Sequence, residues 1–164
     1  MEKIKKLRKL FSIHGLDGYI IPKNDEFFSE YVPQSKDKLK FISNFSGSFG
    51  IALILKNKNY LFVDGRYTLQ AKIQSGKHFN IITIPRKLPK NILKNRKLKI
   101  GFDPKLHTNN GLRMFFRDVK CKLVSIDNNL IDKIWSNKNH ISSNKFYLLP
   151  KKASGQSTKS KISN

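Results

Sequence analysis

Apolar side chains recur along the chain in two spacings, one typical of helices and one typical of buried strands. Ile4, Leu7, Leu10 and Phe11 are three or four residues apart with lysines between them, which predicts an amphipathic, core-facing helix over residues 2–14. Short and nearly continuous apolar runs predict strands over residues 18–22, 49–55, 60–63, 79–84, 99–102 and 122–126.

The segments between these runs predict a hairpin and further helices. The polar turn 56–59 separates two strands, so that these strands should pair as a hairpin. Asp64 can cap a helix from about residue 66 to residue 74. Its apolar side chains available for packing are Tyr67, Leu69, Ala71 and Ile73. Other helices are expected over residues 109–119 and 129–135, and a weak one over residues 87–97.

The alternation of strands and helices indicates one α/β domain over residues 1–148. Because one strand pair is a hairpin, the sheet should be mixed rather than all parallel, with helices flanking it. Residues 149–164 are rich in Lys, Ser, Gly and Asn and nearly free of apolar mass, so we expect a disordered basic tail there.

Composition adds an excess of positive charge. The 164 residues include 33 Lys and Arg against 11 Asp and Glu, a formal net charge of +22. Nucleic acid or another polyanion is therefore an alternative partner, and one contiguous Lys/Arg face with exposed aromatic rings would favour it. The lysines are spread over every segment and arginine is scarce. This favours a codon bias, rather than a bound polyanion, as the origin of the charge.

The sequence also bears on the compartment. Cys121 is the single cysteine, so that no disulfide can form within the chain. The longest apolar run near the basic start is residues 19–21, too short for a signal peptide or a membrane span. We expect a cytoplasmic protein that does not enter a membrane.

Catalytic residues are poorly represented. The histidines are far apart along the chain, at His14, His78, His107 and His140. No glutamate follows Glu30, and no His-Glu-x-x-His motif occurs, so the sequence does not predict a metal site. Cys121 lies between two lysines at the start of a predicted strand, so we expect a structural or incidental thiol rather than a nucleophile. The segment around Ser46 and Ser48 leads into a strand, unlike a nucleophile elbow.

Five motifs in order resemble a known family. They are Ser29–Pro33, Leu39–Ser48, Asp64–Ala71, Ile100–Pro104 with His107 and Thr108, and Asn129–Trp135. Together they resemble the first domain of the three-domain Xaa-Pro aminopeptidases (aminopeptidase P) of the creatinase/prolidase superfamily. Residues 154–157 resemble the opening of the second domain. The chain departs from the family pattern at Asn44, where a glycine is usual, and at Phe49, where a small residue is usual.

The resemblance implies a creatinase N-terminal, ribonuclease H-like fold without catalysis of its own. In that family a separate C-terminal domain binds two divalent metals, typically manganese, so we expect no cofactor in this chain. Arg66 matches a family arginine that faces the substrate cleft, whereas His107 is expected to be a satisfied structural residue. The implied roles are cleft shaping and oligomerisation.

The resemblance also implies partners. They are a separate catalytic-domain chain, a second copy in a homodimer and, only with the catalytic domain, a proline-containing peptide. The chain is then a truncated or split first domain, either half of a split gene or the product of a decaying one. A small basic domain recruited to nucleic acid is the less favoured alternative.

Overall fold

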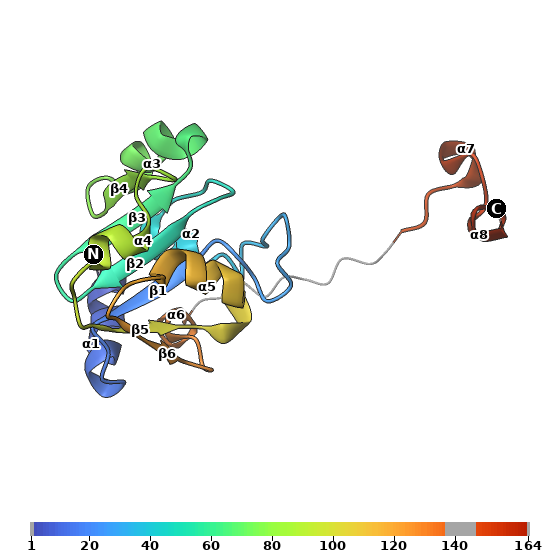
Figure 1. Ribbon diagram of the computed structural model, residues 1–164. Coiled ribbons are helices and arrows are strands. Elements are labelled where there is room, and N and C mark those ends of the chain that lie inside the picture. Colours follow the sequence, from blue (N-terminus) through green and yellow to red (C-terminus); the bar gives the residue numbers. More distant parts are fainter. Residues whose placement is uncertain (1, 137–146, 164) are drawn as a thin grey trace.

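The fold is a six-stranded mixed sheet with strand order β4-β3-β2-β1-β5-β6 and helices on both faces (Figure 1). The computed structural model describes residues 2–136 and 147–163. The strands are β1 (Gly18–Pro22), β2 (Ile51–Leu55), β3 (Asn59–Val63), β4 (Asn80–Thr83), β5 (Lys99–Phe102) and β6 (Lys122–Ser125). Strand β1 pairs antiparallel with β2 and parallel with β5, so the predicted mixed α/β fold is confirmed.

The helices lie before, between and after these strands, up to residue 134. They are α1 (Glu2–Ile13), α2 (Lys38–Ser43), α3 (Thr68–Ser75), α4 (Pro89–Leu93), α5 (Asn109–Phe116) and α6 (Leu130–Ile134), with the 3₁₀ turns η1 (Gly65–Tyr67) and η2 (Pro104–Leu106). None of the helices in the described part of the chain is both long enough and apolar enough to cross a bilayer.

Two apolar clusters lie on opposite faces of the sheet. On β1, Tyr19 and Ile21 belong to the cluster covered by α1, α2, α3 and α6, whereas Ile20 belongs to the cluster covered by α4 and α5. Because side chains alternate across a strand, a strand covered on both faces must be apolar throughout. This arrangement explains the uninterrupted apolar runs of β1 and β2.

The predicted strands and helices are found with small shifts, and α3 differs most from its prediction. The helix expected from residue 66 begins as η1 and continues as α3. Leu69 and Ile73 do not pack, since 73% and 82% of their surface is exposed. Ala71 and Ser75 are buried instead. Positions two residues apart point to opposite sides of a helix, so burying Ala71 turns Leu69 and Ile73 toward solvent.

The sequence pattern did not predict helix α2, and it indicated no regular structure near the C-terminus. Residues 151–154 form α7 (Lys151–Ser154) and residues 158–163 form α8 (Thr158–Ser163), neither with a buried residue. Gly155 ends α7 at a φ of +74°, a conformation that glycine adopts without strain. The boundary at residue 148 and the disorder of residues 149–164 stay predictions.

Candidate functional site

The candidate site is built on the turn that follows β3, where Arg66 lies. Asp64 ends the strand and accepts a hydrogen bond from the Arg66 backbone N–H at 2.9 Å, which caps η1. The same carboxylate accepts from the Arg66 guanidinium, with Nη2 2.7 Å from Oδ2. This hydrogen bond lowers the pKa of Asp64, and the carboxylate in turn raises the pKa of Arg66.

The Arg66 guanidinium is held in place yet open to a ligand. The Arg66 side chain is 74% exposed, against 26% for Asp64. Its guanidinium carbon lies 5.3 Å from the centre of the Tyr67 ring, within reach of a cation–π contact. Since Asp64 occupies one edge of the planar guanidinium, its remaining N–H donors are free to bind a carboxylate or a carbonyl oxygen.

Tyr67 connects this turn to the glycine segment, residues 44–50. Its hydroxyl lies 2.7 Å from Ser48 Oγ, and this hydrogen bond lowers the pKa of Tyr67. Its ring meets the Phe45 ring edge-on, with centroids 5.8 Å apart and an interplanar angle of 80°. A Cβ at Gly47 would lie 2.3 Å from the Phe45 ring and 2.9 Å from the Tyr67 ring, so no side chain fits there.

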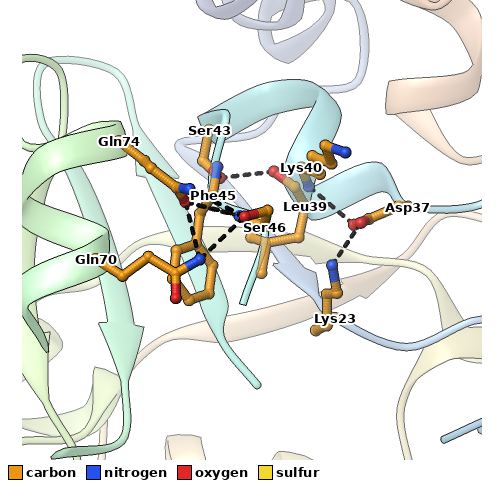
Figure 2. Close-up of polar contacts among 9 residues, drawn as sticks. All are labelled: Lys23, Asp37, Leu39, Lys40, Ser43, Phe45, Ser46, Gln70 and Gln74. Carbon is orange, nitrogen blue, oxygen red and sulfur yellow. Dashed lines mark hydrogen bonds and ion pairs between the residues drawn. The ribbon is translucent and has the colours of Figure 1, made fainter. Parts of the chain in front are cut away.

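The glycine segment is also fixed by side chains of α3 (Figure 2). Gln74 accepts a hydrogen bond from the Ser46 backbone N–H at 2.9 Å, and the amide nitrogens of Gln70 and Gln74 donate to Ser46 Oγ at 3.0 and 2.9 Å. Ser75 Oγ donates to the Ser43 carbonyl at 2.8 Å. The segment is therefore a rigid connection between α2 and β2, without the strand-to-helix turn of a nucleophile elbow.

Asn44 makes the turn at the end of α2, where the resemblance leads us to expect a glycine. It ends α2 in the left-handed conformation, with a φ of +64° and its N–H donating to the Lys40 carbonyl. Glycine adopts this conformation most easily, and asparagine is the next most tolerant residue. Asparagine therefore adopts the left-handed conformation that leads the backbone from α2 into the glycine segment.

A buried ion pair supports the other end of α2. The ammonium of Lys23, just after β1, binds the carboxylate of Asp37, whose other oxygen accepts from the Lys40 backbone N–H at 2.9 Å (Figure 2). The two side chains are only 11% and 6% exposed. Asp37 thus neutralises a buried cation and caps α2 with the same carboxylate.

The other sequence-predicted candidates do not join this site. Within residues 2–136 and 147–163, no three His, Cys, Asp or Glu side chains gather as metal ligands would. Cys121 lies before β6, with Sγ 3.3 Å from the carbonyl oxygen of Arg96. His140 lies outside the described residues. The sequence did not predict the roles of Gln70 and Gln74, because glutamines on a surface helix carry no signal of a distant partner.

His107 corrects one expectation. It follows η2, and its Nε2 is buried without a hydrogen-bond partner among the described residues, so it is not a satisfied histidine. Its ring packs edge-on against Phe102, with centroids 6.0 Å apart. Burial lowers the pKa of His107 to about 4, although the nearby Asp103 carboxylate acts in the opposite direction.

This pKa predicts a pH dependence of stability. The unfolded chain takes up the proton of His107 near pH 6.5, whereas the folded chain takes it up near pH 4. The free energy of unfolding should therefore fall as the pH falls from about 6.5 to about 4 and gain nothing from His107 above that window. Urea titrations across it should show a smaller fall for His107→Gln than for the wild type. The same pH dependence of the free energy of unfolding in both proteins would contradict a lowered pKa of His107.

Comparison with known proteins gives one consistent family. Residues 3–134 match the family described as the creatinase/prolidase N-terminal domain. The Probable Xaa-Pro aminopeptidase P of Coprinopsis cinerea is 34% identical over 98% of this chain, and that of Laccaria bicolor is 34% identical over 98%. The chain spans only 28% and 27% of the lengths of these two relatives.

Solved structures agree with the sequence relatives. The X-prolyl aminopeptidase of Caenorhabditis elegans, described as a cytosolic enzyme with a di-nuclear active site, superposes with a TM-score of 0.80 at 28% identity. The match covers 99% of this chain and 29% of that enzyme. The N-terminal domain of a cytoplasmic peptidase from Mycobacterium tuberculosis shares the fold, with a TM-score of 0.61 at 22% identity over 81% of this chain and 98% of that one.

Proposed function

This chain belongs to the creatinase/prolidase N-terminal domain family, and from that premise we propose that it acts as the non-catalytic first domain of a manganese-dependent Xaa-Pro aminopeptidase. The observation that carries the proposal is the coverage: the family match takes up residues 3–134, while the chain spans 28% of the length of the Coprinopsis relative. The cytosolic description of the C. elegans enzyme supports a cytoplasmic location.

The metal chemistry in this proposal belongs to another part of the enzyme. The described residues do not fit a metal ion, because they offer no grouping of three His, Cys, Asp or Glu side chains. A pair of divalent metals, typically manganese, would be held by a separate catalytic domain, and no step that uses them is assigned to this chain. A catalytic-domain chain and a second copy of this chain are its proposed partners.

Arg66 is the residue that we propose to face the substrate cleft. Its guanidinium is exposed, is oriented by Asp64 and retains donors for a carboxylate or carbonyl of a proline-containing peptide. The neighbouring glycine segment is anchored to α3 through Ser46, so that the wall beside Arg66 is rigid. A rigid wall with one directed cation can orient a peptide without reacting with it.

A cleavage assay tests both parts of the proposal. With manganese and a Gly-Pro-type peptide, the chain alone should show no cleavage, whereas a fusion in which it replaces the matching segment of the C. elegans enzyme should be active. In the fusion, Arg66→Ala should lower kcat/KM by roughly 10- to 100-fold, the factor expected for one lost charge-assisted hydrogen bond.

The matched control is Arg113→Ala, which removes an exposed arginine of α5 on the opposite face of the sheet. It should leave kcat/KM within about twofold of the unmodified fusion, a surface change away from any contact. Cleavage by the chain alone would refute the non-catalytic assignment. Equal kcat/KM for the Arg66→Ala and Arg113→Ala fusions would refute the cleft role.

A further inference from the structure

Lysines cluster at the edge of the sheet where β1, β5 and β6 begin. Three connections each bring two of them to this edge: Lys56 and Lys58 from the β2–β3 turn, Lys97 and Lys99 from the start of β5, and Lys120 and Lys122 from the start of β6. All six side chains are exposed. We call this set the basic edge.

Strand pairing places these connections next to one another. Gly18 of β1 is in register with Leu55 of β2 on one side and with Ile100 of β5 on the other. Lys99 is in register with Lys122 of β6. Because neighbouring strands lie about 4.8 Å apart, the sheet fixes Lys99 and Lys122 side by side, and the other four lysines lie on the connections that lead into these strands and into β3.

The acidic residues leave most of this row without a counter-charge. In the described part of the chain Asp17 forms an ion pair with Lys56, and no ion pair involves the other five lysines of the basic edge. Acidic residues instead follow the opposite ends of the strands: Asp25 after β1, Asp64 after β3, Asp103 after β5 and Asp127 after β6. Asp118, before Lys120, adds a second carboxylate that pairs with Arg117, so the six lysines still outnumber the carboxylates at this edge of the sheet.

The surface of the basic edge indicates the kind of polyanion that fits. A hollow of about 280 Å³ opens onto it, lined by Lys56, Lys58, Arg96 and also Asp17. The exposed aromatic rings of residues 2–136 lie at the other end of the sheet, at Phe27, Phe28, Tyr31 and Phe49, so none can stack on bases here. Lysine binds phosphate as a point charge, whereas base reading is mainly the role of arginine, asparagine and glutamine.

We propose that the basic edge binds the phosphate backbone of double-stranded nucleic acid without reading its sequence. A row of exposed lysines on neighbouring connections matches a regularly charged backbone, and each phosphate contact releases condensed counterions, which drives binding. The interaction is independent of the aminopeptidase role, because Arg66 and the basic edge lie at opposite ends of β3.

Binding of a labelled 24-base-pair DNA duplex of arbitrary sequence tests the proposal. The wild-type chain should bind, and the triple variant Lys58→Gln, Lys99→Gln, Lys122→Gln should bind at least about tenfold more weakly at low salt. The slope of log K against log salt should become shallower by about 0.9 for each phosphate contact removed. Circular dichroism and thermal unfolding should show that the variant is folded.

The matched control removes the same charge elsewhere. Lys40→Gln, Lys72→Gln and Lys105→Gln change exposed lysines of α2, α3 and η2, and this triple variant should retain the wild-type affinity within about twofold and keep the salt slope. Equal weakening by both triple variants would overturn the proposal, because binding would then follow net charge. So would a wild-type chain that fails to bind, or competition by polyglutamate as strong as that by the unlabelled duplex.

Discussion

Replacing Phe45 with alanine should destabilise the domain by about 3–5 kcal/mol, a large share of the 5–15 kcal/mol typical of a folded domain. The Phe45 ring is completely buried, meets the Tyr67 ring edge-on and lies close to Gly47 and Gly50. Its removal loses the transfer free energy of the ring and leaves a cavity. The glycine segment and α3 are each anchored, which limits how far they can close it.

Urea unfolding of Phe45→Ala and of Phe49→Ala measures this effect against a neighbouring control. Phe49 belongs to the same segment but is 40% exposed, so its truncation should lower the free energy of unfolding by less than about 1.5 kcal/mol. A Phe45→Ala loss no larger than that of Phe49→Ala would mean that the ring does not support the segment.

Removing the Asp37 carboxylate should lower the free energy of unfolding by a similar amount. Asp37→Ala leaves the Lys23 ammonium buried without its counter-charge and also removes the cap of α2. Breaking a buried ion pair on one side typically costs about 3–5 kcal/mol, and losing a cap about 1 kcal/mol. The free energy of unfolding, measured by urea titration at neutral pH, should fall by an amount in the first range.

Two further variants separate the ion pair from the cap. Asp37→Asn keeps a good capping side chain but removes the charge. It should therefore lose most of the free energy of unfolding that Asp37→Ala loses. Replacing both partners, with Lys23→Met and Asp37→Leu, should recover all but about 1–2 kcal/mol, since no buried charge remains unpaired. Wild-type stability in Asp37→Asn would show that the cap alone matters.

The sequence predicted the strands well because each is a short apolar run bounded by polar residues. The hairpin β2–β3 and the amphipathic helices α1 and α5 were predicted for the same reason: their pattern is local. Helix α2 was missed, because six residues are too few to show a helical period and its stability comes from the Asp37 cap and from packing on β1.

The pairing of strands that are far apart along the chain cannot be predicted from such local patterns. No spacing within the chain indicates that β1 pairs with β5, yet that pairing fixes the strand order. The orientation of α3 was predicted wrongly, because its apolar side chains fit both faces and only contact with the sheet selects Ala71 over Leu69 and Ile73.

The candidate site was predicted in part. The capping of the turn by Asp64 follows from local residue preferences, and the structure agrees. The cluster formed by Ser46, Gln70 and Gln74 depends on residues that are 24 and 28 positions apart along the chain. The gathering of six lysines at one edge of the sheet could not be predicted along the chain either, because lysines are scattered throughout it.

The central place of β1 has a consequence for how the chain emerges from the ribosome. Its partner on one side, β2, begins at Ile51, but on the other side Asp17 accepts a hydrogen bond from the backbone N–H of Lys99, which is 82 residues later. At a synthesis rate of about 5–20 residues per second, on the order of ten seconds pass between the synthesis of β1 and that of β5. During this interval an apolar strand, Gly18–Pro22, presents unpaired backbone groups to neighbouring nascent chains. Co-translational capture by a chaperone is therefore most useful to this protein before residue 99 is made.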